Sequence, residues 1–272
     1  NDMYVFGGSD DFRVSRSLWK LDFATLRWFK LLPNPQHPRR PCGRKGHVMC
    51  YHKPTHSLLM YGGMISLDHP VVDKQVWSYD IASGCWNALR SIGNEPSGRM
   101  YHVAELNENC NKMLLFGGRK IVSDSEANNS VLNDLYEYNL VTGVWREIHA
   151  PNAPPPRMCA ASVFFNGHFC VFQGGAETYL NDSYEYCERT GQWRRLADGP
   201  HCTRPTVVRN DNMFIHFGGA ANPSFRQETQ VLFLEPASLL EECATWLSKL
   251  PKRGKPMPSA VRNVLQSQLT QV

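Results

Sequence analysis

The sequence predicts an all-β protein built from stacked sheets and followed by a short α-helical tail. One β-rich unit recurs five times between residue 1 and about residue 235. The apolar periodicity then changes from that of strands to that of helices. A unit of about 50 residues cannot bury both faces of its own sheet, so arrays of this kind stack neighbouring sheets radially.

A pair of glycines marks each repeat. The pairs are 55, 55, 57 and 44 residues apart, and each follows a short apolar strand. Glycine readily takes the positive φ of a sharp turn, so each strand is expected to end at its pair. The pairs are Gly7–Gly8, Gly62–Gly63, Gly117–Gly118, Gly174–Gly175 and Gly218–Gly219.

A loop and an alternating strand follow each pair. These strands are LWKLDF (18–23), VWSYDI (76–81), LYEYNL (135–140), SYEYCE (183–188) and VLFLEP (231–236). In the first four repeats a hairpin turn then leads to a tryptophan, which we expect to fill the space between sheets. The tryptophans are Trp28, Trp86, Trp145 and Trp193.

One more strand precedes the next glycine pair, and an arginine introduces it. The arginines Arg44, Arg99, Arg157 and Arg204 recur at one point of the repeat, which favours a structural role. His47 and His102 also recur at one point, which indicates structure rather than chemistry. The pattern predicts three strands in the first repeat, four in each of the next three and three in the last.

The order Gly-Gly, aromatic strand, tryptophan resembles the kelch repeat over residues 1–235. The resemblance implies a kelch β-propeller. Members of this family usually close with about six blades, so we expect an N-terminal blade, or most of one, to be absent from this chain. Closure with five blades is the alternative.

Composition excludes several classes of function. A net charge of +4 gives no concentrated basic face for nucleic acid, and no apolar run is long enough to cross a membrane. The nine cysteines are odd in number and contain no CxxC pair, which favours a reduced cytoplasmic or nuclear protein. No HExxH, GxSxG or phosphate-loop motif occurs, so we expect no enzyme, no metal and no cofactor.

Residues 236–272 form the predicted tail. SLLEECATWL (238–247) and MPSAVRNVL (257–265) place apolar residues on one face of a helix, with a Pro- and Lys-rich break between them. On pattern alone, the two helices could simply cap the propeller.

The spacing within the tail also resembles two known motifs. The first segment is similar to the Elongin-BC box, which implies contacts of Leu239, Cys243, Trp246 and Leu247 with Elongin C in Elongin B/C. The second is similar to the Cullin-2 box, which implies contacts of Pro258, Val261 and Leu265 with Cullin-2. Such contacts would use the helix-in-groove mode of recognition.

Propeller and tail together resemble the kelch-domain-containing substrate receptors of Cullin-2 RING ubiquitin ligases. The resemblance implies a non-catalytic protein that binds the C-termini of substrate proteins on its propeller and the ligase through its tail. The alternative is a kelch scaffold of cytoskeletal or signalling type.

The loops near the propeller centre supply the candidate binding residues. Arg119 follows its glycine pair directly, and the other repeats carry no basic residue there. In the receptors that the chain resembles, an arginine at this place binds the substrate carboxylate, and a Ser used by some members is Met158 here. The other candidates are Arg13, Arg16, Arg44, Lys45, Arg99, Tyr101, Lys120, Arg157, Arg204 and Arg226.

Overall fold

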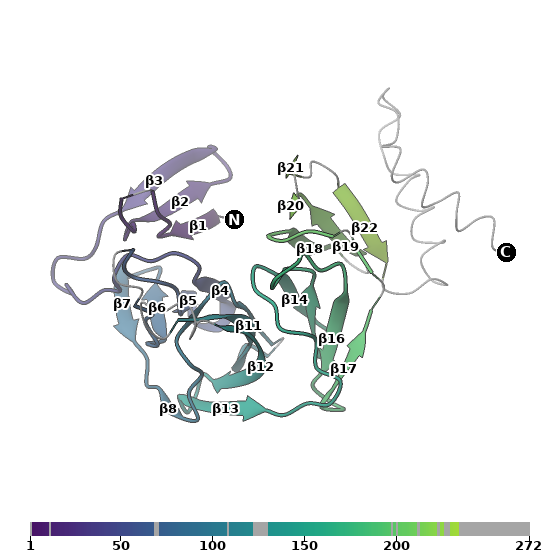
Figure 1. Cartoon of the computed structure of the whole chain (residues 1–272). Helices are drawn as coiled ribbons and strands as arrows, with labels where there is room; N and C mark the ends of the chain where they lie inside the picture. Colours follow the sequence, from purple (N-terminus) through teal and green to yellow (C-terminus); the bar gives the residue numbers. More distant parts are fainter. Residues whose placement is uncertain are drawn as a thin grey trace.

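The computed structural model describes most of the repeat region. The described residues are 2–10, 12–67, 71–107, 109–121, 130–196, 198–199, 201–210, 213–221, 224–225 and 229–233. Within these ranges the chain is a kelch β-propeller, with five main sheets arranged around a common centre (Figure 1). No helix in this part of the chain is long and apolar enough to cross a bilayer.

The described sheets have three, four, four, four and three propeller strands in chain order, as predicted. The first contains β1 (Asp2–Phe6), β2 (Leu18–Asp22) and β3 (Arg27–Leu31). The second contains β4 (Val48–His52), β5 (Ser57–Tyr61), β6 (Trp77–Asp80) and β7 (Cys85–Ala88), with the 3-10 helix η1 (Lys53–Thr55) between β4 and β5. The third contains β10 (Val103–Leu106), β11 (Lys112–Lys120), β12 (Ser130–Asn139) and β13 (Val144–Ile148).

The two remaining main sheets and the short strands complete this part of the chain. The fourth sheet contains β14 (Ala161–Phe165), β15 (His168–Phe172), β16 (Ser183–Cys187) and β17 (Gln192–Arg195). The fifth contains β18 (Thr206–Asn210), β19 (Met213–Phe217) and β22 (Thr229–Phe233). In the third sheet β9 (Arg99–Met100) pairs with β11 and β8 (Ile92–Gly93) with β13, while β20 (Ala220–Ala221) pairs with β21 (Ser224–Phe225).

Successive strands within each sheet pair antiparallel, and the strand that follows each arginine is innermost. The innermost strands β4, β10, β14 and β18 contact one another in chain order. Their neighbours β5, β11, β15 and β19 carry the apolar runs that end at the glycine pairs. The ends of the innermost strands therefore surround the centre of the array (Figure 1).

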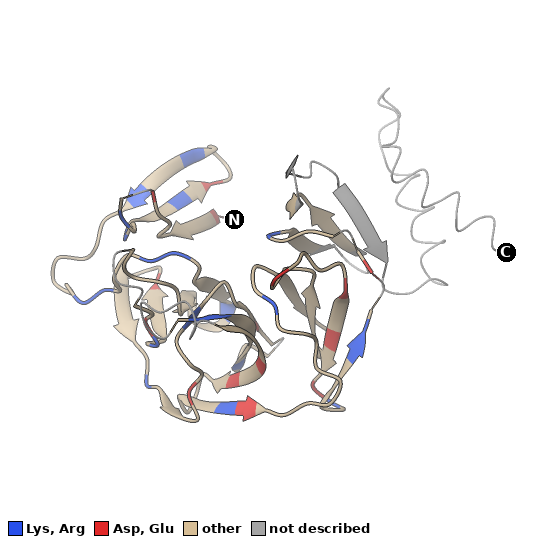
Figure 2. Cartoon of the chain, in the orientation of Figure 1, with Lys and Arg blue, Asp and Glu red and all other residues tan. Residues whose placement is uncertain are grey.

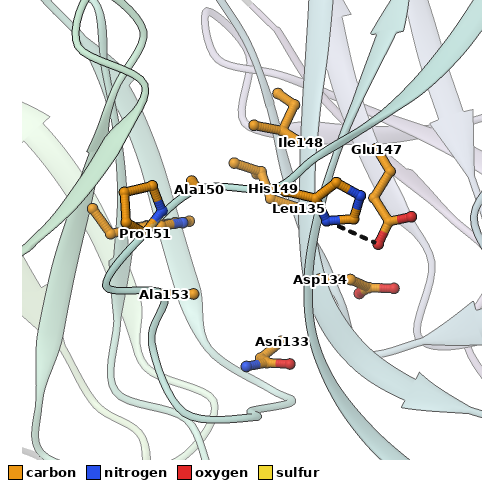
Figure 3. Close-up of a pocket in the computed structure, with 10 residues that line it drawn as sticks. Asn133, Asp134, Leu135, Glu147, Ile148, His149, Ala150, Pro151 and Ala153 are labelled. Atoms are coloured by element: carbon orange, nitrogen blue, oxygen red, sulfur yellow. Dashed lines mark ion pairs between the residues drawn. The ribbon is translucent and has the colours of Figure 1, made fainter.

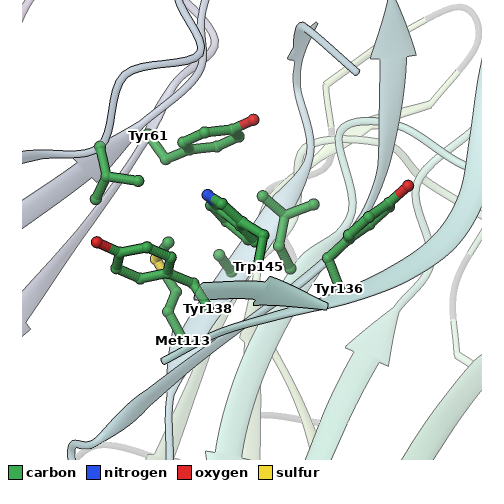
Figure 4. Packing of buried hydrophobic residues seen from close by; sticks show 8 residues of the cluster. Tyr61, Met113, Tyr136, Tyr138 and Trp145 are labelled. Carbon is green, nitrogen blue, oxygen red and sulfur yellow. The ribbon is translucent and has the colours of Figure 1, made fainter. Parts of the chain in front are cut away.

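Tryptophans form the core between sheets, as the sequence predicts. Three of the four repeat tryptophans pack on the aromatic residue that precedes the glycine pair of the preceding sheet: Trp86 on Phe6, Trp145 on Tyr61 and Trp193 on Phe116, with ring centroids 5.0–5.2 Å apart. Figure 4 shows Trp145 enclosed by Tyr61, Tyr136, Tyr138 and Met113. Burial of such a side chain removes roughly 150–250 Å² from water, which is worth several kcal/mol at about 25 cal/mol/Å².

At each outer edge of the described array, one residue of this tryptophan–aromatic contact is present without its partner. Trp28 is 48% exposed, whereas Trp86, Trp145 and Trp193 are 7%, 1% and 2% exposed. At the other edge, Phe217 precedes the last glycine pair and is 58% exposed. Within the described residues, Trp28 therefore lacks an aromatic neighbour from a preceding sheet, and Phe217 lacks a tryptophan from a following one.

The fourth glycine pair differs from the prediction by one residue. In the first three repeats the second glycine donates its N–H to the carbonyl of the arginine that precedes the next inner strand, and in the fourth repeat the corresponding donor is Gly174, which bonds to the carbonyl of Cys202. Gln173 therefore occupies the first place of the pair, at φ +50°, and Gly175 is the residue after it. The prediction was wrong because the strand FCVFQ includes Gln173, whose left-handed backbone conformation no sequence pattern marks.

Candidate functional site

A hydrogen-bonded arc of backbone surrounds the centre of the propeller, where the innermost strands begin. We call Gly46, Tyr101, Cys159 and Arg204 the central arc. The N–H of Tyr101 donates to the carbonyl of Gly46 at 2.7 Å, that of Cys159 to Tyr101 at 2.9 Å, and that of Arg204 to Cys159 at 2.7 Å. Four neighbouring sheets are thus joined directly through their main chains.

All four residues of the arc have left-handed backbone conformations. Their φ values are +67°, +58°, +54° and +56° in chain order. Only Gly46 takes such a value without steric cost, since a side chain on the other three crowds the backbone. Strain of this kind, about 1–3 kcal/mol for each residue, is concentrated at functional sites in many proteins.

The arc corrects the predicted equivalence of Arg204 with the earlier arginines. Arg44, Arg99 and Arg157 each lie two residues before a residue of the arc, whereas Arg204 is itself the fourth residue of the arc. Cys202 takes the place of the arginine in the last repeat, since its carbonyl accepts from Gly174. The prediction was wrong because it aligned arginines by residue type, and the last repeat is offset by two positions.

Arg99 and Arg157 are not available to a ligand. They are 0% and 1% exposed, and each guanidinium spans from a backbone carbonyl at the glycine pair to an aspartate. Arg99 contacts Asp134 at 2.5 and 2.8 Å, and Arg157 contacts Asp182 at 2.9 and 3.1 Å. This burial corrects their assignment to the binding surface and supports the structural role that their recurrence indicated.

Arg44 has the same structural role in the second sheet. It is fully buried and donates to the carbonyl of Gly62 at 2.9 Å and to Asp73 at 2.6 Å. Burial would raise the pKa of Asp73, but hydrogen bonds from Gln75, Arg44 and Trp77 together lower it. The three buried arginines therefore fasten the glycine pairs that shape the centre.

Arg119 lies beside the central arc. It pairs with Met100, the residue before Tyr101, in the same way that Met64 pairs with Lys45 and Gly175 with Met158. Its side chain is half-buried, and no carboxylate among the described residues pairs with it. Lys120 follows it, also half-buried, and Met158 is half-buried next to Cys159.

Arg204 is the exposed cation of the arc. Its guanidinium lies 5.8 Å from the centre of the Tyr101 ring, an arrangement suited to a cation–π contact. Hydrogen bonding to the Cys159 side chain raises its pKa, and a guanidinium group is charged at physiological pH in any case. Tyr101 thus positions a cation without neutralising it.

Basic residues dominate this region, and Figure 2 shows the wider distribution of charge. Lys45, Arg119 and Arg204 belong to the arc or pair beside it, and none has an ion-pair partner among the described residues. Arginine presents a planar pair of donors that suits a carboxylate. The arrangement can therefore hold an anionic group.

The structure describes some of the remaining predicted residues and not others. Arg226 lies outside the described residues, as do Leu239, Cys243, Trp246, Leu247, Pro258, Val261 and Leu265. Arg13 and Arg16 are exposed in the segment between β1 and β2, and Arg13 pairs weakly with Asp10 at 3.5 Å.

Sequence reasoning missed Gly46 and Cys159. Gly46 carried one usable signal, since GRKGH places a second glycine two residues after the repeat arginine. Cys159 carried none, because its importance depends on a backbone conformation and a neighbour 45 residues away. No disulfide joins two of the eight cysteines in the described ranges, which include every cysteine but Cys243, and no group of three or more metal-ligating side chains occurs there.

Comparison with known proteins identifies the family that this arrangement of sheets suggests. The profile of the KLHDC2/KLHL20/DRC7 Kelch-repeats domain matches residues 1–219 and again residues 71–261. The chain therefore belongs to the kelch-repeat family, whose members are generally non-enzymatic protein-interaction domains.

Individual relatives share the repeats at modest identity. The chain is 28% identical over 181 residues to acyl-CoA-binding domain-containing protein 6 of Oryza sativa, which covers 64% of this chain and 26% of that protein. It is 27% identical over 247 residues to acyl-CoA-binding domain-containing protein 5 of Arabidopsis thaliana, covering 85% and 36% respectively. It is 30% identical over 122 residues to the leucine-zipper-like transcriptional regulator 1 homolog of Drosophila melanogaster, covering 43% and 12%. The matches thus span about a third or less of these relatives.

Proposed function

We propose that this protein is the substrate receptor of a Cullin-2 RING ubiquitin ligase, and that its central arc captures the C-terminal carboxylate of target proteins. One observation carries the proposal: Lys45, Arg119 and Arg204 gather around the propeller centre without a described carboxylate to neutralise them. The kelch-repeat family supports the coarser role of a protein-interaction module. The predicted Elongin-BC and Cullin-2 boxes of residues 238–247 and 257–265 support the finer one.

Arg119 is the residue on which carboxylate capture depends most. It comes directly after a glycine pair, and its pairing with Met100 holds its backbone beside the arc. A carboxylate bound through two charge-assisted hydrogen bonds would gain about 1.5–3 kcal/mol from each. Arg204, held over Tyr101, is placed to add a second positive charge.

Peptide binding tests carboxylate capture. An array of randomised peptides with free C-termini is probed with the purified protein, and the tightest ligand is remade with an amidated C-terminus. We expect amidation and Arg119→Ala each to weaken binding at least tenfold, and Arg146→Ala, on the exposed surface of β13, to leave it unchanged. Equal binding of the free and amidated peptides would remove the carboxylate site and leave the ligase role untouched.

Co-purification tests the ligase role separately. Leu239→Ala with Cys243→Ala is expected to abolish binding to Elongin B/C, whereas Thr245→Ala, between the anchors of the same segment, should retain it. Pro258→Ala with Leu265→Ala is expected to reduce Cullin-2 binding while Elongin B/C stays bound. If the Leu239 and Cys243 double variant still binds Elongin B/C, the protein is instead a kelch scaffold. The proposed role places it in the cytoplasm or nucleus.

A further inference from the structure

A basic groove lies beside the second sheet and shares no residue with the central arc. It encloses about 740 Å³, within the range of small-ligand sites. Its walls come from the segment before β6, the end of β7 and the linker to the third sheet, together with Arg39 of the linker between β3 and β4. We call it the Arg90 groove, and its charged lining consists of Arg39, Asp73, Lys74, Arg90 and Glu95.

The three cations of the groove are exposed to solvent. None of Arg39, Lys74 and Arg90 forms an ion pair with a carboxylate of the described residues. Arg39 is positioned by Trp77, since its guanidinium carbon lies 5.9 Å from the centre of the indole ring. An aromatic ring attracts this cation without neutralising it, so its charge stays available to a partner.

Asp73 lines the groove but does not neutralise these cations. Its carboxylate accepts from the guanidinium of Arg44 at 2.6 Å, from the indole N–H of Trp77 at 3.1 Å and from the backbone N–H of Gln75 at 2.9 Å. Because Arg44 is fully buried, its charge needs that of Asp73 as a partner. Glu95 is the one remaining carboxylate of the lining, so the three cations leave an excess of two positive charges.

The equivalent groove beside the third sheet has the opposite charge. It encloses about 540 Å³, and Figure 3 shows Asp134 and Glu147 around it. The residue four positions after the repeat tryptophan is Arg90 in the first groove and His149 in the second, and the residue two positions after it is Ala88 or Glu147. The repeat thus forms grooves of either charge, so the basic lining of the Arg90 groove is not a requirement of the fold.

An excess of positive charge along a concave wall selects for an anionic partner. Clefts lined by one sign of charge focus the electrostatic field, whose effect extends over about 8–10 Å at physiological salt. A protein that binds nucleic acid commonly contacts about 6–10 phosphates, whereas this groove offers three cations. A short run of aspartate or glutamate side chains matches the groove in both size and sign.

We propose that the Arg90 groove binds an acidic segment of a partner protein, in which two or more neighbouring carboxylates contact Arg39, Lys74 and Arg90. The contacts use side-chain carboxylates, so they need no free C-terminus. The inference therefore does not rest on carboxylate capture at Arg119, and a partner can dock here whether or not its C-terminus lies in the central arc.

Peptide titration tests the proposal. A fluorescein-labelled peptide of six consecutive glutamates, with an amidated C-terminus, is titrated with the 272-residue protein while its anisotropy is measured. At about 50 mM sodium chloride we expect it to bind at least about tenfold more tightly than the matched peptide of six glutamines. The difference should shrink at about 300 mM, because salt screens exposed charges.

Charge reversal locates the contact. Glutamate at all three of Arg39, Lys74 and Arg90 is expected to weaken binding of the glutamate peptide at least about tenfold. Arg90→Gln alone should weaken it about two- to fivefold, which keeps the test valid if the triple variant is unstable. The matched control has the same net charge and should bind within about twofold of the native protein; it carries glutamate at three exposed cations elsewhere, namely Arg27, Lys53 and Arg189.

Four results would each overturn the proposal. They are equal binding of the two peptides, an unchanged affinity in Arg90→Gln, an equal loss in the groove variant and its control, and tighter binding of the oligonucleotide hexathymidylate than of the glutamate peptide. Arg119→Ala, which removes the proposed carboxylate capture, should leave the affinity for the amidated peptide unchanged. If Arg119→Ala weakens binding as much as the groove variant does, the central arc holds the peptide and the groove does not.

Discussion

Single arginines determine the geometry at the centre of the propeller. Arg44, Arg99 and Arg157 each connect an inner strand to the carbonyl of a residue in a glycine pair and to one aspartate. A guanidinium has five donors in a rigid plane, so one buried side chain can satisfy several acceptors that water cannot reach. The buried arginines thus hold in place the backbone that carries the ligand-binding candidates, and they are not themselves available to a ligand.

Replacement of Arg99 by methionine should therefore be severe. It would leave the Asp134 carboxylate and the carbonyl of Gly117 without their donors, and we expect a loss of about 3–5 kcal/mol in the free energy of unfolding, measured by urea denaturation. Arg146→Met, at an exposed pair with Glu137, should cost less than about 1 kcal/mol.

The double variant Arg99→Met with Asp134→Leu separates pairing from packing. Removal of both charges should recover a large part of the loss, because no charge is then left unpaired. If the double variant is as unstable as the sum of the two single variants, the interaction between the partners contributes little and shape dominates.

Contacts between elements repeat one rule, in which a tryptophan of one sheet packs on the aromatic residue that ends the preceding sheet's apolar strand. The sequence predicted that the tryptophans fill the space between sheets, because they recur once in each of the first four repeats, but it did not identify the aromatic partner. It could not predict that Trp28 is half exposed, since exposure depends on a neighbouring sheet and not on the local pattern.

Tryptophan substitution measures the difference between covered and open edges. In the 272-residue chain, Trp145→Phe should cost about 2 kcal/mol or more, because it opens a cavity and removes the bond to Ser91. Trp28→Phe should cost less than about 0.5 kcal/mol. Thermal and urea unfolding of both variants checks the contrast, and equal losses would mean that Trp28 is covered in solution.

The candidate site was only partly predictable from the chain. Arg119 was identified because, of the residues that directly follow the five glycine pairs, it is the one that is basic. Arg99 and Arg157 were candidates as basic loop residues, yet burial of their guanidinium groups depends on Asp134 and Asp182, which lie 35 and 25 residues away. The offset of Arg204 depends on backbone conformation, which residue type does not reveal.

At the scale of the whole molecule, buried titratable groups make stability depend on pH. Burial lowers the pKa of His47 and of His216 to about 4, and lowers that of His102 well below its usual range. Burial among the inner strands raises the pKa of Glu105 to about 7, opposed by a hydrogen bond from Ser162. The histidines favour the native state above the unfolded pKa near 6.5, whereas Glu105 favours it at lower pH.

Acidification from pH 7 to pH 5 should therefore destabilise the protein. As the pH falls below about 6.5, the three histidines contribute less to the free energy of unfolding. Protonation of Glu105 offsets only part of this decrease, so we expect a net loss of a few kcal/mol. Urea denaturation at several pH values measures it. Glu105→Gln should be more stable than the native sequence at pH 8 and should lose stability more steeply on acidification, and an unchanged slope would contradict the role of Glu105.

The two open edges have a consequence for how such a chain can change in length. Trp28 is a repeat tryptophan without the aromatic partner that Phe6, Tyr61 or Phe116 provides at the covered interfaces. Phe217 is the converse, an aromatic residue at the place of those partners without a tryptophan. A copy of any of the first four repeats carries both kinds of residue, so such a unit, duplicated or deleted, leaves a compatible neighbour at each junction. Gene duplication and loss can therefore add or remove whole sheets without a compensating change in the packing between sheets.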